Sequence, residues 1–196
     1  MGQIELVEKL INKNNGIIKS SQLSEKNIPR QHLKLMLQKK LLVKVSRGIY
    51  IKKGGFEDTL YTYQQRYAKG IYSHETALYI HQFTDRMLDR YIMTFPQGYH
   101  IKTVVSDFVI KQANLDIYNL GMEEKKTNYG NKIKVYNIER TLCDIVRGSN
   151  IDDKQLVIPA IKKYISKRNK NIPLLIEYAS KLRVKNKITK YLQVLL

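Results

Sequence analysis

A short segment near the amino terminus places hydrogen-bonding and cationic side chains on one face of a predicted helix. Wound at about 100° per residue, residues 29–40 bring Leu33, Met36 and Leu37 to one side, with Leu41 following on the same side. Arginine and glutamine side chains read base edges in the major groove of duplex DNA, and lysines bind phosphates. The candidate DNA contacts of this segment and its neighbours are Ser20, Ser21, Arg30, Gln31, His32, Lys34, Gln38, Lys39 and Arg47.

The elements around that helix predict a winged helix-turn-helix, the fold that would present it to DNA. Periodic apolar residues predict a first helix over residues 3–14, and a serine can cap a short second helix over about 21–26. Two β-branched runs flank a Ser-Arg-Gly turn and predict a hairpin over 42–51 with Arg47 at its tip. A pair of glycines follows the hairpin, so this domain is predicted to span residues 1–55.

The composition agrees with a nucleic-acid-binding protein. The chain of 196 residues holds 35 Lys and Arg against 17 Asp and Glu, a formal net charge of +18, and the excess lies at both ends. Such a cationic chain attracts polyanions. The single cysteine excludes a disulfide framework and a zinc cluster of cysteines, and is typical of a protein in the reducing cytoplasm. No apolar run reaches about 18 residues and no Gly-rich phosphate loop is present, so neither a membrane span nor a cofactor is expected.

The rest of the chain, residues 56–196, predicts a larger α+β domain that ends in basic helices. Ser73 and Asn137 each precede a helical pattern and are expected to cap it, and Cys143 falls on an apolar helix face, where a core position is expected. The predicted helices cover 59–67, 73–81, 137–147, 152–167, 173–183 and 187–196, and the predicted strands cover 91–96, 108–112, 121–127 and 132–136.

The last helices carry a further excess of cations over acids. A cluster of this kind is either a solvated helix face or a second DNA-binding surface, and the sequence leaves both interpretations open. The residues of this possible second surface are Lys162, Lys163, Lys167, Arg168, Lys181 and Arg183.

Three other residues match the pattern of a metal-dependent nuclease. Asp107 is followed sixteen residues later by Glu123 and then Lys125, and in a nuclease the carboxylates would hold Mg²⁺ while the lysine orients water. The opposing interpretation is a solvated, charged hairpin. His74 and His81 are seven residues apart, about 10.5 Å along a helix and too far for one metal ion. A DNA-binding protein with a nuclease domain is therefore the alternative function, whereas the favoured interpretation has no metal site and no enzymatic activity.

Several motifs, taken in order, give the chain a resemblance to a known family. An Arg-Gly-Ile-Tyr wing is followed by Ser-His-Glu-Thr-Ala-Leu, and Arg86 lies between this motif and the next strand. Together with their neighbours, these motifs resemble the AbiEi antitoxins of abortive-infection, type IV toxin–antitoxin systems over about three-quarters of the chain. The matching segments are residues 16–23, 41–50, 72–79, 92–96 and 137–144.

The resemblance implies a function more specific than DNA binding. It implies a bacterial antitoxin that represses its own operon by binding inverted-repeat operator DNA through the amino-terminal winged helix. Two copies would then pair on the operator. It also implies that the carboxy-terminal domain neutralises a cognate nucleotidyltransferase toxin, which in a type IV system does not require a stable complex. The remaining alternative is a winged helix that docks onto an acidic protein or RNA.

Overall fold

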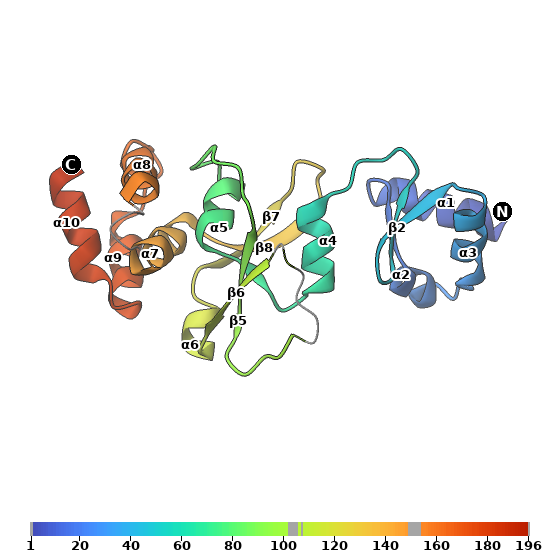
Figure 1. The fold of residues 1–196 in the computed structure, drawn as a ribbon, viewed down its shortest axis with the longest axis horizontal. Helices are drawn as coiled ribbons and strands as arrows, with labels where there is room; N and C mark the ends of the chain where they lie inside the picture. The colour runs from blue at the N-terminus through green and yellow to red at the C-terminus, as the bar shows by residue number, and fades with distance from the viewer. Residues whose placement is uncertain (1, 102–105, 107, 149–153, 196) are drawn as a thin grey trace. The chain divides into compact units, whose positions relative to one another are not determined.

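The structure, a computed structural model, has a mixed α+β fold, as the sequence predicts (Figure 1). The chain divides into two compact units. The amino-terminal unit comprises Met1–Ala68 with Lys126–Ile133, and the carboxy-terminal unit comprises Lys69–Lys125 with Lys134–Leu196. The residues that the structure describes are 2–101, 106, 108–148 and 154–195.

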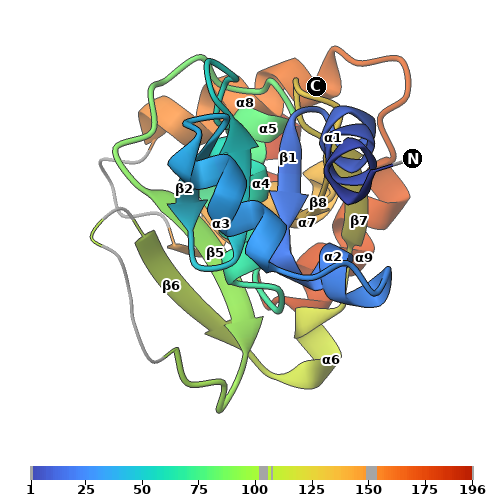
Figure 2. The same ribbon diagram turned by 90° about the vertical axis from the view of Figure 1, so that its right-hand side faces the viewer.

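The amino-terminal unit combines helices with one antiparallel three-stranded sheet (Figure 2). Its elements are α1 (Gln3–Lys13), β1 (Ile17–Lys19), α2 (Ser20–Glu25), α3 (Gln31–Gln38), β2 (Leu42–Ser46), β3 (Ile49–Lys52) and α4 (Thr59–Arg66). The predicted hairpin is confirmed as β2 and β3, which pair in antiparallel register. Strand β1 adds to the other edge of β3, a pairing that the sequence pattern does not reveal.

An apolar core holds the first three helices of this unit together. Helix α1 contributes Val7 and Ile11, α2 contributes Leu23, and α3 contributes Leu33 and Met36, each at most 3 % exposed. Burying a side chain of this size stabilises the folded state by roughly 1.5–3 kcal/mol. Because the two core residues of α3 are three positions apart, they lie on one side of the helix and leave the other side to solvent.

A buried carboxylate joins residues 126–133 to this unit. Asp58 is 2 % exposed and caps α4, since its Oδ1 accepts from the backbone N–H of Tyr61 at 3.0 Å. Its Oδ2 accepts from Thr127 Oγ1 at 2.5 Å and from Asn131 Nδ2 at 2.8 Å. Three donors satisfy a carboxylate that burial would otherwise destabilise. The amino-terminal unit therefore includes α4 and this distant segment of the chain.

The carboxy-terminal unit is built on a five-stranded mixed sheet that α5 and α6 contact. Its elements are β4 (Ile71–Tyr72), α5 (His74–Ile80), β5 (Tyr91–Pro96), β6 (Phe108–Ala113), α6 (Leu115–Tyr118), β7 (Met122–Lys126), β8 (Lys132–Tyr136), α7 (Ile138–Gly148), α8 (Lys154–Ile165), α9 (Ile172–Lys181) and α10 (Lys185–Leu195). The strand order is β6-β5-β4-β8-β7. Strand β4 is antiparallel to β5 and parallel to β8, and β5 is parallel to β6.

Helix α7 lies at the centre of this unit, in contact with α5, α8 and α9. Residues 139–146 are all buried, including the charged ones. Arg140 is 2 % exposed, and its Nε lies 3.0 Å from both carboxylate oxygens of Asp144, one turn later. Its Nη1 donates to the Leu120 carbonyl at 3.1 Å, and the guanidinium lies 4.3 Å from the centre of the Tyr136 ring. These partners replace the water that the charges lose on burial.

The two predicted helix caps in this unit differ in outcome. The Asn137 side chain accepts from a backbone N–H three residues later at 3.0 Å, which confirms it as the cap of α7. Ser73 does precede α5, but its hydroxyl makes no capping hydrogen bond and instead accepts from Thr94 Oγ1 at 2.9 Å. The Thr76 hydroxyl accepts from the backbone N–H of Ile92 at 2.8 Å. These hydroxyls therefore fasten α5 to β5 rather than completing its first turn.

Candidate nucleic-acid interface

Helix α3 exposes the side chains that the sequence predicts as DNA contacts. Gln31, Lys34, Gln38 and Lys39 are all exposed, on the side away from the apolar core. The helix is shorter than the predicted residues 29–40, since it begins at Gln31 and ends at Gln38. Beyond its end the chain leaves helical geometry, and Lys40 has φ 54°. The shortening does not remove any of these side chains from the exposed face.

Arg30 lies at the start of α3 and is exposed, and its side chain is held by α2. Its Nε and Nη2 donate to Ser24 Oγ at 3.1 Å and 3.0 Å. Nη1 remains available to a ligand. Ser21 is exposed and Ser20 half-buried, but α2 begins at Ser20 and its cap position is Lys19. The expectation that one of these serines caps α2 is therefore wrong.

The turn between β2 and β3 carries an exposed Arg47 and is anchored to the start of α2. The backbone N–H of Ser20 donates to the carbonyl of Gly48 at 2.8 Å. Gly48 has φ 75°, and a Cβ at this position would lie 2.8 Å from Ser20 Oγ. The left-handed backbone conformation therefore favours glycine here, and a methyl group would also displace the Ser20 hydroxyl from its present position.

Replacing that glycine should destabilise the turn. We expect Gly48→Ala to lower the free energy of unfolding by about 1–2 kcal/mol, mainly through the left-handed φ, with a smaller contribution from displacing the Ser20 hydroxyl. Gly54 is the matched control, because it has the same φ of +75° and nothing lies within 4 Å of the position that an alanine methyl group would occupy. Gly54→Ala should cost only about 1 kcal/mol. Urea unfolding of the full chain measures both, and equal losses would show that the contact with α2 is unimportant.

His32 contributes to helix packing rather than to the exposed face. Its Nε2 lies 2.7 Å from Gln3 Oε1 on α1, and its Nδ1 is buried. We therefore leave it out of the proposed contact surface. Lys44, which the sequence does not single out, is exposed on β2. The signal that could have found it is the charge of the segment: residues 26–56 contain no Asp or Glu.

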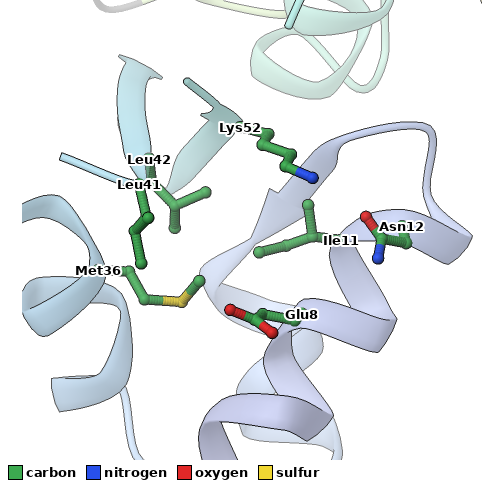
Figure 3. A pocket seen from close by; sticks show the side chains of 7 residues that line it. All are labelled: Glu8, Ile11, Asn12, Met36, Leu41, Leu42 and Lys52. Atoms are coloured by element: carbon green, nitrogen blue, oxygen red, sulfur yellow. The ribbon is translucent and has the colours of Figure 1, made fainter. Parts of the chain in front are cut away.

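A small hollow lies on the same unit, lined by residues of α1 and α3 and by Leu41 and Leu42 (Figure 3). Ile11, Met36 and Leu41 point into it, in a volume of about 160 Å³. Small-molecule sites usually exceed about 300 Å³, so this hollow is small for a ligand. Leu41, predicted on the buried side, is 43 % exposed, because α3 ends before reaching it. That prediction is wrong.

The cations of the possible second surface are all exposed. Lys163 and Lys167 lie together, with each ammonium 5.9 Å from the centre of the Phe83 ring. On α9, Lys181 pairs with Glu177 at 2.7 Å, which offsets its charge locally. Lys163 and Lys167 therefore share one aromatic partner, whereas Lys181 is paired with a carboxylate.

A polar cleft of the carboxy-terminal unit contains Glu123 and Lys125 of the nuclease pattern. Lys125 Nζ lies 3.0 Å from His81 Nδ1, and His81 Nε2 lies 2.8 Å from the carbonyl oxygen of Tyr136. These distances assign a neutral imidazole that donates from Nε2 and accepts at Nδ1. Glu123 Oε1 lies 3.8 Å from the same Nε2. Asp107 lies outside the described residues.

Burial dominates the electrostatics of this cleft. It lowers the pKa of His81 to about 4; the Tyr136 carbonyl opposes that shift, and the charge of Lys125 adds to it. Burial also raises the pKa of Glu123, against the attraction of Lys125. Burial lowers the pKa of Lys125, and the attraction of the Glu123 carboxylate opposes that shift. His81 is therefore uncharged at neutral pH.

The depressed pKa of His81 predicts a loss of stability in acid. Between pH 6.5 and about 4, the unfolded chain binds a proton at His81 that the folded protein does not, so stability falls as the pH falls. The loss from pH 7 to pH 5 amounts to about 2 kcal/mol. His81→Gln removes this titration and should lose about that much less over the same interval. Urea unfolding at pH 7 and pH 5 measures the loss in the free energy of unfolding for each protein. Equal losses in the wild type and in His81→Gln would refute the predicted contribution of His81.

Within the described parts of the chain, none of the helices combines the length and the apolar character that a membrane span requires. In the same ranges, no three His, Cys, Asp or Glu side chains are placed to share a metal ion.

Comparison with known proteins gives information on the fold only. No family model matches the chain, and no curated protein matches its sequence. The chain is similar to the crystal structure of the RV2827C protein from Mycobacterium tuberculosis, with a TM-score of 0.57 and 13 % sequence identity. The similarity covers 89 % of this chain and 70 % of that one. At this identity the likeness supports the α+β architecture and carries no functional assignment.

Proposed function

We propose that the protein binds duplex DNA through its amino-terminal unit, acting as a winged helix-turn-helix in which α3 enters the major groove. The observation that carries this proposal is the exposed, acid-free face of α3 opposite a continuous apolar core. In this arrangement α2 and α3 form the helix-turn-helix, and the β2–β3 turn forms the wing. Leu35, 41 % exposed on the same helix, can pack against a thymine methyl group.

Each exposed side chain has a role that follows from its chemistry. Arg30 at the start of α3 suits guanine, and Gln31 and Gln38 suit adenine, through paired hydrogen bonds to base edges. Lys34 is assigned to phosphate, where an ammonium group binds without sequence preference. Arg47 on the wing is assigned to phosphate or to the adjacent minor groove. Sequence preference therefore depends on Arg30, Gln31 and Gln38, and affinity on the lysines and the wing.

The proposal predicts a steep dependence of DNA binding on salt. Fluorescence anisotropy with the duplex upstream of the gene should show affinity falling by roughly 100-fold from 50 to 200 mM salt if four phosphates are contacted. A scrambled duplex of the same length is the control and should bind more weakly at every salt concentration. An affinity that is insensitive to salt would contradict phosphate contacts and favour docking of this unit onto a protein.

The biological role that we propose is that of an antitoxin in a type IV system. It would act in the cytoplasm, repress its own operon from an inverted repeat bound by two copies, and oppose a nucleotidyltransferase toxin through the carboxy-terminal unit. The support for this role is the resemblance of ordered motifs along the chain. Two of these, residues 72–79 and 137–144, contribute the start of α5 and the start of α7.

A genetic experiment tests the antitoxin role separately from DNA binding. Co-expression of this chain should restore growth to cells that express the nucleotidyltransferase encoded beside it, whereas an unrelated winged-helix protein should not. A chain that binds operator DNA but fails to restore growth would be a repressor only. The nuclease alternative predicts that the purified protein cuts plasmid in Mg²⁺ or Mn²⁺ and that Glu123→Gln stops it. The antitoxin should leave plasmid intact.

A further inference from the structure

The polar cleft of the carboxy-terminal unit has a volume and a lining that the proposed DNA-binding role does not use. Its walls come from the end of α5, from β7, from the start of α7 and from the end of α8 with the residues that follow. Its volume is about 310 Å³. This lies at the lower limit of small-molecule sites, which begin near 300 Å³, so the cleft suits one compact ligand rather than a polymer.

The carboxylates of this cleft already have partners within the protein. Glu139 is 7 % exposed, and its Oε1 accepts from the hydroxyl of Tyr164 at 2.9 Å. That hydroxyl in turn accepts from the backbone N–H of Asn171 at 2.8 Å. Glu123 lies beside His81 and Lys125. A ligand would therefore meet Glu123 as the more accessible acceptor.

The cations of the cleft keep donors available for a ligand. Lys125 directs one N–H at a neutral imidazole, which leaves two. Lys167 lines the cleft and has no carboxylate within ion-pair distance in the described parts of the chain. The ring of Phe83 lies beside the ammonium group of Lys167, and the ammonium group of Lys163 lies beside the same ring. Two ammonium groups beside an aromatic ring at the edge of a cleft would attract an anionic group.

We propose that this cleft binds a nucleoside phosphate. Lys163 and Lys167 hold the phosphate, because an ammonium group binds phosphate as a compact positive charge. Phe83 packs against the face of the base, as aromatic side chains do for unstacked bases. The amide of Asn169 reaches a polar edge of the base, and Glu123 accepts from a ribose hydroxyl. The site lies wholly within the carboxy-terminal unit, so nucleotide binding can be tested separately from operator binding.

Calorimetric titration of the full-length protein tests this site. The probes are AMP, GMP, CMP and UMP, with ribose 5-phosphate and inorganic phosphate as fragments. We expect at least one nucleotide to bind more tightly than either fragment. Lys167→Ala should weaken that binding roughly tenfold through loss of a charge-assisted hydrogen bond. Lys190→Ala removes an exposed lysine of α10 outside the cleft and should leave the affinity unchanged.

A second variant separates recognition of the base from recognition of the phosphate. Phe83→Leu keeps an apolar side chain but removes the ring, so it should weaken nucleotide binding several-fold while leaving ribose 5-phosphate binding as it is. Unfolding curves of each variant establish that it is folded. The proposal is overturned if no nucleotide binds at millimolar concentration, if Lys167→Ala binds like the wild type, or if inorganic phosphate binds as tightly as every nucleotide.

Discussion

Replacing Arg30, Lys34 and Arg47 together by alanine should lower operator affinity by roughly 100-fold or more near 150 mM salt. Each replacement removes one charge-assisted contact with DNA. The three residues sample the start of α3, its middle and the β2–β3 turn, and all are exposed, so the triple alanine variant should still fold. The slope of log affinity against log salt concentration should also become shallower by about two, because Lys34 and Arg47 are assigned to phosphates and Arg30 to a base. Anisotropy measurements on the upstream duplex give both quantities.

A charge-matched variant shows whether this effect is local. Arg90, Lys111 and Lys190 are exposed in the carboxy-terminal unit and outside both predicted DNA surfaces, so replacing all three by alanine removes the same net charge. This variant should bind within a few-fold of the wild type. If both triple variants weaken binding equally, the protein attracts DNA through its overall charge and α3 has no special role.

Arg140→Met should be among the most destabilising single substitutions in the chain, with a loss of about 3–5 kcal/mol in the free energy of unfolding. Asp144 is 4 % exposed and would be left buried, without the guanidinium that lies 3.0 Å from its oxygens. Replacing both residues, as Arg140→Met with Asp144→Leu, should recover part of the loss because no uncompensated charge remains. Urea unfolding of the full chain measures the three proteins.

Lys181 and Glu177 offer a control with the same four-residue spacing but in water. Their ion pair is 2.7 Å long, and the two side chains are 53 % and 52 % exposed. Lys181→Met should therefore leave stability unchanged within error, because water solvates the remaining carboxylate. An Arg140→Met variant as stable as Lys181→Met would show that α7 is not the buried centre of its unit.

Local patterns predicted much of the fold. The apolar spacing of Val7, Leu10 and Ile11 gives α1, and β-branched runs on either side of a Gly-containing turn give β2 and β3. Asn137 was predicted to cap α7 because asparagine is favoured at the residue that precedes the first turn of a helix. The exposed face of α3 follows in the same way from a period of 3.6 residues, so most of the candidate DNA contacts could be identified without coordinates.

What the sequence missed depends on contacts between distant residues. Strand β4 has two residues, too few for an alternating pattern, and its place in the sheet comes from pairing with β5 and β8. The contact of His32 with Gln3 joins residues 29 apart, which no local pattern encodes. Charged residues on α7 suggest solvent exposure, whereas burial of Arg140 follows from partners supplied by other elements. The polar cleft likewise assembles from separate segments.

Cleavage of the operator by a chelate tethered to α3 tests the DNA-binding proposal most directly. The native Cys143 is fully buried and burial raises its thiol pKa to about 12, so a cysteine introduced at exposed Lys40, just after α3 and outside the assigned contacts, can be labelled selectively with an iron chelate. The Lys40→Cys conjugate should cut within each half of the inverted repeat, and an Asn119→Cys conjugate, exposed after α6, should not. Cutting from the Asn119 position alone, or none above free chelate, would contradict the placement of α3 in the groove.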